Sequence, residues 1–294
     1  MRDMRYTVSI DGSLVRPEDA KVSVFDRGFL YGDSVFEVFR TYEGTPFRER
    51  EHLERLARSA ERIFIDLPID LETLSREIHE ALDASELPNA YVRVVVTRGS
   101  GPIVLDPSTA VSPTRVIIVA PVTPPDPSLY EAGVPVISVR HAQSSSPAAG
   151  AKASNYLDNL LAQREARAKG AHEAIFVSPT GDLLEGATSN VFVLRDGILM
   201  TPSLDLGILG GITRAMVMKA AEREGVACAE GRLSIETLEL AEEVFITSSI
   251  REVMPVVRFD DRVIGRGVPG PVTRRLHATY RALIREEIER SRKG

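Results

Sequence analysis

The sequence predicts an α/β (α+β) protein of two domains, and three observations lead to this expectation. Expected strands outnumber expected helices in both halves of the chain. The 294 residues are enough for two hydrophobic cores. Residues 121–127 contain four prolines, which remove backbone donors, disfavour helix and favour an extended connection. We therefore expect a smaller N-terminal α/β domain at residues 1–120, a proline-rich linker at residues 121–132, and a larger β-rich domain with helices at residues 133–294.

The N-terminal half opens on a predicted hairpin. Residues 6–10 and 13–15 flank Asp11-Gly12, a pair that favours the tight turn matching strand twist. Apolar residues at helical spacing predict a helix over residues 50–63 and a second one over residues 71–82. Further strands, the later ones rich in valine as buried strands often are, are expected at residues 22–25, 35–42, 91–97 and 115–120.

The C-terminal half alternates predicted strands with predicted helices. Strands are expected at residues 134–139, 190–194 and 244–246, the second of them between two hairpin turns. A charged helix closes the chain. A helix over residues 155–169 is predicted from an apolar face formed by Leu157, Leu160, Leu161 and Ala168.

Composition excludes several classes of function. The net charge of −6 argues against a general nucleic-acid surface. Cys228 is the only cysteine, which excludes an intrachain disulfide and fits a reducing compartment. No apolar run reaches the roughly 18 residues of a membrane span, and the first residues do not resemble a signal peptide. The five histidines lack metal-ligand spacing. We expect a cytoplasmic protein without a metal, nucleic-acid or membrane partner.

One lysine is distinguished by its surroundings. Lys152 lies among small residues at positions 148–155, so a bulky group would be able to approach its amine closely. An amine in a partly apolar pocket becomes a nucleophile that is able to form an imine. On this stretch alone, a solvated loop lysine is an equally good interpretation.

Other segments offer the groups that an imine-forming lysine needs. Residues 210–213 predict a glycine-rich helix start, whose free N–H groups and positive end suit a phosphate. Residues 247–249 would add hydroxyl groups and Arg50 a positive charge. Glu185 stands among strand-forming residues, where a buried carboxylate needs a cationic partner such as a protonated pyridine nitrogen.

Each of these groups also has an ordinary structural explanation: a glycine turn, a polar strand end, a surface arginine and a turn glutamate. Together, an amine, a carboxylate and phosphate donors are what pyridoxal phosphate requires. A nucleotide is the alternative ligand for the helix start, but the chain has no Gly-rich loop followed by Lys-Ser or Lys-Thr.

The order of these motifs resembles that of the fold-type IV (class IV) pyridoxal-phosphate aminotransferases, which include branched-chain and D-amino-acid aminotransferases and the related aminodeoxychorismate lyases. The resemblance extends over residues 8–265. It implies a two-domain fold-type IV enzyme with pyridoxal 5′-phosphate in the interdomain cleft, a ping-pong Schiff-base mechanism, and a homodimer with shared active sites. Its motifs lie at residues 26–33, 47–56, 152, 185–190, 211–214 and 252–256.

The resemblance also implies roles for single residues. Lys152 is similar to the catalytic Schiff-base lysine that moves the proton, and Glu185 to the glutamate that pairs with the pyridine nitrogen. Tyr156 is similar to a tyrosine that hydrogen-bonds the ring hydroxyl, although it lies one residue closer to the lysine than in bacterial branched-chain enzymes. The other expected cofactor-binding residues are Arg50, Ser189, Leu209, Ile212, Thr213 and Ser249.

The expected substrate-binding residues divide between two groups of the family. Tyr31, Phe36 and the 91–93 segment resemble the branched-chain pattern, whereas Val38 stands where those enzymes usually carry glycine. Ser248-Ser249 and residues 252–256 resemble the D-amino-acid group. The full set is Arg27, Tyr31, Phe36, Val38, Arg40, Tyr91, Arg93, Arg98, Ser249 and Ile250.

The arginine and histidine motif with which typical D-amino-acid enzymes bind the α-carboxylate is absent from residues 100–106. One of Arg27, Arg40, Arg93 and Arg98 would have to replace it, and a structural ion pair is the alternative role for each.

We therefore expect a transaminase that passes the amino group of an amino acid to 2-oxoglutarate or pyruvate, with D-amino acids as donors and a non-standard carboxylate-binding site. The alternatives are a branched-chain L-amino-acid aminotransferase with (R)-amine side activity, an aminodeoxychorismate lyase, and a protein that binds the cofactor without turnover. The joint presence of the lysine, the glutamate and the phosphate residues argues against the last.

Overall fold

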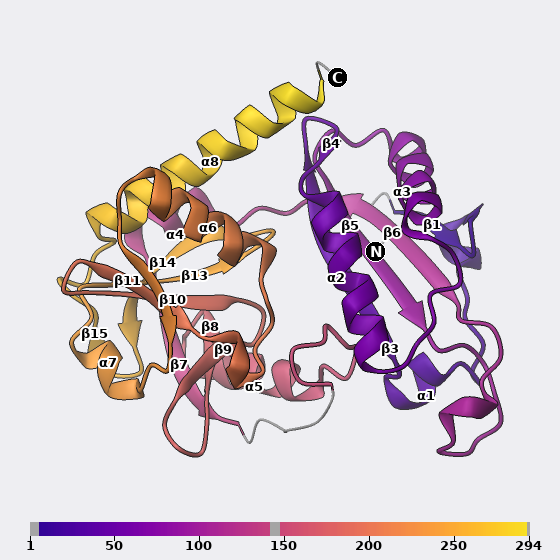
Figure 1. Cartoon of the computed structure of the whole chain (residues 1–294), viewed down its shortest axis with the longest axis horizontal. Helices are drawn as coiled ribbons and strands as arrows, with labels where there is room; N and C mark the ends of the chain where they lie inside the picture. Colours follow the sequence, from indigo (N-terminus) through magenta and orange to yellow (C-terminus); the bar gives the residue numbers. More distant parts are fainter. Residues whose placement is uncertain (1–5, 142–147, 293–294) are drawn as a thin grey trace. The chain divides into compact units, whose positions relative to one another are not determined.

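The computed structural model describes residues 6–141 and 148–292 (Figure 1). The chain divides into two compact units, residues 1–123 with 151–156, and residues 124–150 with 157–294. The expected linker is extended over only part of its length, because β6 (Arg115–Pro121) ends in it and α4 (Pro127–Ala132) forms its second half. The Asp126 carboxylate accepts from the Ser128 N–H, and a proline at the first helical position removes only a donor that has no intrahelical partner.

An antiparallel sheet of six strands forms the first unit, in the order β2-β1-β6-β5-β3-β4. The predicted Asp11-Gly12 hairpin is confirmed, with positive φ at both turn residues. The predicted strand at residues 22–25 is wrong, since these residues form no strand in the structure. The other elements of this unit are β1 (Thr7–Ile10), β2 (Ser13–Val15), α1 (Arg27–Tyr31), β3 (Ser34–Tyr42), β4 (Thr45–Pro46), α2 (Glu49–Arg62), α3 (Leu71–Ser85), β5 (Ala90–Thr97), and the short 3₁₀ turns Pro17–Asp19 and Pro107–Thr109.

The two faces of the first sheet differ in chemistry. Alternate residues of a strand point to opposite faces. Val35 and Phe39 of β3 and Val92, Val94 and Val96 of β5 are buried in one core with apolar residues of α2 and α3. The intervening positions of β3 and β5 therefore form a second face that α2 and α3 do not cover.

Residues 151–156 join this unit because they pair with an edge of β3. The Phe36 N–H donates to the Lys152 carbonyl at 2.9 Å, and the Ser154 N–H donates to the Ser34 carbonyl at 2.9 Å. Val35 and Ala153 form an antiparallel bridge between these two bonds. The backbone of the lysine segment is thus fixed as a short extra strand.

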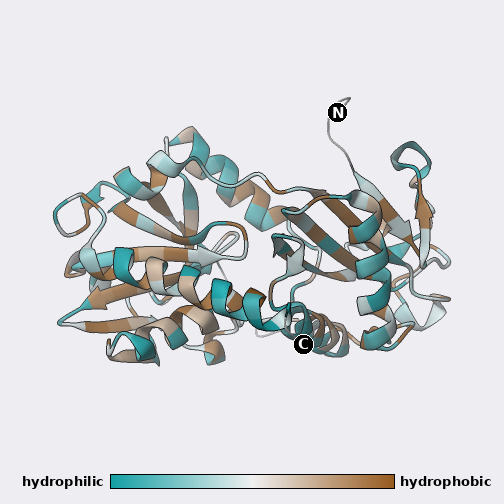
Figure 2. Ribbon diagram, turned by 90° about the horizontal axis from the view of Figure 1, so that it is seen from above, coloured by the Kyte–Doolittle hydropathy of each residue, from teal (hydrophilic) through white to brown (hydrophobic). Residues whose placement is uncertain are grey.

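A mixed nine-stranded sheet forms the second unit, in the order β12-β11-β10-β13-β14-β7-β8-β9 with β15 beside β14. Its strands are mostly hydrophobic, whereas its helices carry many hydrophilic residues (Figure 2). The elements are β7 (Val134–Arg140), α5 (Leu157–Ala168), β8 (Glu173–Val177), β9 (Leu183–Gly186), β10 (Asn190–Arg195), β11 (Ile198–Pro202), the 3₁₀ turn Leu204–Leu206, α6 (Ile212–Arg223), β12 (Cys228–Gly231), α7 (Ile235–Glu239), β13 (Glu243–Ser248), β14 (Glu252–Phe259), β15 (Arg262–Val263) and α8 (Pro271–Ser291).

Helix α5 is present, but its predicted buried face is wrong. Leu157, Leu160 and Leu161 are each more than half exposed. The helix instead buries Ala162 and Ala166 against the sheet. Small side chains allow a close approach to the strands, so the leucines remain on the outer face.

Candidate active site

Lys152 is half-buried and has specific neighbours. Its Nζ lies 3.2 Å from the Tyr156 hydroxyl oxygen, 4.6 Å from the centre of the Phe36 ring and 5.6 Å from that of Tyr156. Its backbone N–H donates to Ser59 Oγ on α2 at 3.1 Å. The two rings meet edge to face with their centres 5.1 Å apart. An aromatic wall and a hydroxyl therefore surround the amine, as the imine-forming interpretation requires.

Five of the predicted substrate residues share the uncovered face of the first sheet. Val38 of β3 lies directly opposite Arg93 of β5, and Arg40 lies opposite Tyr91. Phe36 is two residues before Val38 and so points to the same side. The Arg93 guanidinium stacks on the Phe36 ring at 4.0 Å, so this face is continuous with the surroundings of Lys152.

Arg93 differs from the other candidate arginines in its partners. Within residues 6–141 and 148–292 it forms no ion pair with a carboxylate. Its guanidinium lies over the Phe36 ring, and the N–H groups of a guanidinium lie in its own plane, so this ring contact does not occupy them. Arg40 also lies over an aromatic ring, that of Tyr42, at 4.2 Å, whereas the ring under Arg93 is the one that Lys152 contacts.

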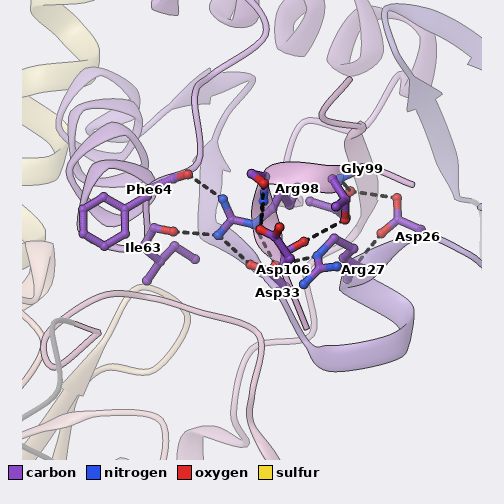
Figure 3. Close-up of polar contacts among 12 residues, drawn as sticks. Asp26, Arg27, Asp33, Ile63, Phe64, Arg98, Gly99 and Asp106 are labelled. Atoms are coloured by element: carbon purple, nitrogen blue, oxygen red, sulfur yellow. Dashed lines mark hydrogen bonds and ion pairs between the residues drawn. The ribbon is translucent and has the colours of Figure 1, made fainter. Parts of the chain in front are cut away.

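Two other predicted substrate arginines stabilise the first unit instead (Figure 3). Arg98 binds both carboxylate oxygens of Asp33, at 2.7 and 2.9 Å, and donates to the carbonyls of Ile63 and Phe64 at the end of α2. Arg27 is buried, and it donates to Asp33 at 3.2 Å and to the Val104 carbonyl at 2.9 Å. These contacts give both side chains the structural role that was the alternative for each.

Tyr31 follows the same pattern. Its ring lies 5.0 Å from the guanidinium carbon of Arg27, and the side chain is partly exposed at the end of α1. It therefore belongs to the loop that Arg27 stabilises, rather than to the face that carries Phe36 and Arg93.

The arginine predicted to bind phosphate is poorly placed for that role. The Arg50 side chain is 88% exposed and pairs with Glu54 one turn along α2. Arg55, on the buried face of the same helix, binds both oxygens of Glu37 at 2.6 and 2.7 Å. Helical spacing was the missed signal, since Arg55 falls beside the apolar positions of α2 and Arg50 does not.

Glu37 is fully buried beneath the Phe36 face. His52 Nδ1 lies 2.7 Å from its second oxygen. Burial alone would raise the pKa of Glu37, but the Arg55 guanidinium and the His52 ring outweigh it and lower the pKa to about 2. Burial also lowers the pKa of His52, which favours its neutral form.

In the second unit, Glu185 is tied to the loop before α6. Its Oε2 accepts from the Leu209 N–H at 3.1 Å and from Asn190 Nδ2 at 3.4 Å. Asn190 also donates to the Leu209 carbonyl at 2.9 Å. A Cβ on Gly211 would overlap Asn190 Oδ1, so the glycine allows this amide to pack against the start of α6. Asn190 was not predicted as a site residue, although it lies in the 185–190 motif.

Two neighbours of Asn190, the residue that packs against the start of α6, carry buried hydroxyl groups. Gly211 is the N-cap, and no side chain caps the N–H groups that follow it at Ile212 and Thr213. Asn190 is paired with Thr247 between β10 and β13. Ser189 Oγ and Thr247 Oγ1 are both buried and have no hydrogen-bond partner among the described residues.

These groups fit the phosphate ester of a cofactor, since buried hydroxyl groups and uncapped amides need an acceptor. Ser249 and Ile250 follow in the turn after β13 and are half-buried. The structure thus gathers Glu185, Ser189, Leu209, Ile212, Thr213, Ser249 and Ile250 within one unit.

Neither a metal site nor a membrane span is found in the described part of the chain. No group of three or more His, Cys, Asp or Glu side chains there is arranged to hold a metal ion. No helix there is both long and apolar enough to cross a membrane.

Comparison with known proteins identifies the family. The model of the amino-transferase class IV family matches residues 34–259, most of the chain. The chain belongs to the class IV aminotransferases. This aminotransferase is 39% identical over 276 residues to the "Putative branched-chain-amino-acid aminotransferase" of Methanocaldococcus jannaschii, covering 93% of this chain and 95% of that protein. It is 34% identical over 278 residues to the D-alanine aminotransferase of Staphylococcus epidermidis, covering 94% and 97%.

Solved structures agree with this assignment. The branched-chain amino acid aminotransferase of Escherichia coli has a TM-score of 0.89 at 34% identity, covering 95% of this chain and 94% of that one. The branched-chain enzyme from T.th., complexed with N-(5′-phosphopyridoxyl)-L-glutamate, has a TM-score of 0.87 at 31% identity, covering 95% and 93%. The expected α/β fold-type IV class, aminotransferase activity and pyridoxal phosphate cofactor are thereby confirmed.

Proposed function

We propose that this aminotransferase transfers the amino group of a D-amino acid to a 2-oxo acid, pyruvate or 2-oxoglutarate, and that Arg93 binds the substrate carboxylate. The observation that carries the proposal is the position of Arg93, which stacks on the Phe36 ring beside Lys152 and has no carboxylate partner among the described residues. A guanidinium is well suited to a carboxylate because its N–H groups bind both oxygens.

Lys152 would move the proton at the substrate Cα. Bound pyridoxal phosphate supplies an electron sink for the charge that develops at this carbon. The Tyr156 hydroxyl, 3.2 Å from Nζ, would orient the amine, and the Phe36 ring would exclude water from it. Ser59 fixes the backbone of the lysine from α2.

Residues of the second unit would bind the other groups of the cofactor. Glu185, oriented by Asn190 and the Leu209 N–H, would hold the pyridine nitrogen protonated. The N–H groups of Ile212 and Thr213 and the hydroxyls of Ser189 and Ser249 would bind the phosphate, and Leu209 would pack against the ring.

Among the arginines of α2, Arg55 is the one that we propose as a cation for the phosphate. It lies one turn before Ser59, which bonds to Lys152, whereas Arg50 projects into solvent. This assignment replaces Arg50 in the predicted cofactor set.

The preference for D-amino acids rests on the Ser248-Ser249 and 252–256 pattern and on the likeness to D-alanine aminotransferase. A lysine delivers a proton to one face only, so the side on which Arg93 holds the carboxylate determines the enantiomer. The second candidate is a branched-chain L-amino-acid aminotransferase, which the E. coli and M. jannaschii relatives favour.

Half-reactions with single donors test the activity and its stereochemistry. The purified enzyme should be yellow, and D-alanine and D-glutamate should bleach that absorption, whereas Lys152→Ala should show no turnover. Bleaching by L-leucine alone would show that the L-amino-acid alternative holds. Full transaminase turnover by Lys152→Ala would remove Lys152 from the mechanism.

An amine without a carboxylate tests the role of Arg93. Arg93→Ala should raise the KM for amino acids about 100-fold, since a paired charge-assisted contact contributes about 3 kcal/mol. The same variant should leave the half-reaction with (R)-phenylethylamine unchanged, because this amine has no carboxylate. Equal losses with both donors would contradict a carboxylate-binding role.

We also propose that the enzyme is a homodimer, with the active sites shared as the family resemblance implies. Two loops of the first unit lie side by side, since Asp26 bridges Ser100 and the Gly101 N–H donates to the Phe25 carbonyl at 3.2 Å. The two loops and their flanking residues expose the apolar side chains of Phe25, Phe29, Ile103, Leu105 and Val111. Several exposed apolar side chains on neighbouring loops are typical of a protein interface.

Sedimentation should give a dimer for the natural chain and a monomer for Leu105→Asp, a change at a side chain that is 84% exposed. Leu14→Asp, at an exposed leucine of β2, is the matched control and should remain dimeric. A monomeric natural chain would refute the dimer.

A further inference from the structure

Glu173 of β8 carries a buried negative charge that none of the roles above uses. The side chain is fully buried. Its Oε1 accepts from the Thr188 N–H at 2.7 Å and from the Thr188 hydroxyl at 3.1 Å. Its only cationic partner among the described residues is Arg251, whose Nη1 bonds to Oε2. A buried carboxylate of this kind is retained only where such a partner is fixed.

Arg251 lies in the turn between β13 and β14, two residues after Ser249. Its Nη2 donates to both the carbonyl and the hydroxyl oxygen of Thr188, and its Nε donates to Ser248 Oγ at 3.3 Å. One guanidinium therefore links the turn that carries Ser249 and Ile250 to the turn that carries Thr188 and Ser189.

Residues of other elements also hold the backbone of this turn. The Tyr130 hydroxyl donates to the Arg251 carbonyl at 2.9 Å. Glu252 has a φ of 56°, a left-handed conformation that costs a non-glycine residue about 1 kcal/mol. Its carboxylate is held by Arg281 at 2.7 Å and lies 2.8 Å from His277 Nε2. The conformation is thus imposed by its surroundings.

We propose that Arg251 is a positioning residue, which through Glu173 and Thr188 holds the Ser249 turn in the geometry that binds the cofactor phosphate. This inference rests on the proposed role of Ser249. Arg251 itself is engaged by Glu173, Thr188 and Ser248, so it acts on the phosphate through the turn and not by direct contact.

Titration of the apoenzyme with pyridoxal phosphate and with pyridoxal, which lacks the phosphate, tests the proposal. Arg251→Ala should weaken the binding of pyridoxal phosphate about tenfold and leave that of pyridoxal unchanged. Arg251→Lys keeps the positive charge but loses the forked contacts, so it should show a smaller weakening of the same kind. Arg232→Ala, at an exposed ion pair of the same unit, is the matched control and should bind both ligands normally.

Two further variants distinguish the positioning role of Arg251 from a loss of stability and from an error in the phosphate assignment of Ser249. Arg251→Ala with Glu173→Gln removes the buried charge, and should restore stability while pyridoxal phosphate binding stays weak. Recovery of binding in this double variant, or equal losses for both ligands in Arg251→Ala, would overturn the proposal. If Ser249→Ala weakens pyridoxal phosphate and Arg251→Ala does not, the positioning role alone fails. If Ser249→Ala has no effect, both the phosphate-binding role of Ser249 and the positioning role of Arg251 fail.

Discussion

Replacing Glu37 by Gln tests the buried network beneath the Phe36 face. The pKa of Glu37 falls from 4.5 to about 2 in the folded protein. At about 1.4 kcal/mol per pH unit, this corresponds to roughly 3 kcal/mol of stability from the ionised form. The variant loses this contribution and the buried ion pair between Glu37 and Arg55, so we expect a loss of about 3–5 kcal/mol near neutral pH.

The sign of the pH dependence follows from the direction of the shift. Because the folded pKa lies below the unfolded one, the contribution is complete above about pH 4.5 and is lost as the pH falls toward about 2. The difference between the natural chain and Glu37→Gln should therefore shrink steadily over that range.

Urea unfolding at neutral and acid pH measures both quantities. Glu54→Gln, which removes an exposed ion pair of the same helix, is the control and should cost about 0.5 kcal/mol or less. A loss below about 1 kcal/mol for Glu37→Gln at neutral pH, or one that does not change with acid, would refute the reasoning.

Two further substitutions test the site from other directions. Gly211→Ala would force the Asn190 amide away from Leu209 and Glu185; we expect a loss of about 1–3 kcal/mol and weaker pyridoxal phosphate binding. Thermal unfolding and cofactor titration measure these effects, and Gly210→Ala, whose Cβ would meet no atom closer than 3.8 Å, should show neither. Arg98→Ala should lower the unfolding free energy by about 2–4 kcal/mol without changing the KM for amino acids, because its contacts are structural; a raised KM with unchanged stability would contradict this.

Elements specified by local chemistry were predicted well from the sequence. The Asp11-Gly12 hairpin and the helix that starts after Gly211 depend on turn geometry and capping, which neighbouring residues determine. The α/β class follows from the hydrophobic patterns of single strands and helices, which are also local. The glycines that start α6 are a local signal too, so the helix start was recognisable as a candidate anion site.

Features that depend on tertiary packing were not predictable in the same way. The leucines of α5 have helical spacing, but the sheet that they were expected to contact accommodates Ala162 and Ala166 instead. For Arg50 and Arg55, helical spacing does separate the arginine beside the apolar positions of α2 from the one outside them, but it does not reveal that the buried partner of Arg55 is Glu37. The spacing of the leucines in α5 likewise did not reveal which face of that helix the sheet covers.

The pairing of residues 151–156 with β3 affects how separable the two units are. The chain passes from one unit to the other after residues 123, 150 and 156, so no single cut divides it into independent modules. A fragment that ends at residue 123 would lack the strand that covers part of the β3 edge, and an uncovered edge favours aggregation. Conversely, a fragment that begins at residue 124 would contain Lys152 without the partners in β3 and α2 that fix its backbone. Shuffling of domains between relatives would therefore have to transfer this short segment together with the N-terminal sheet.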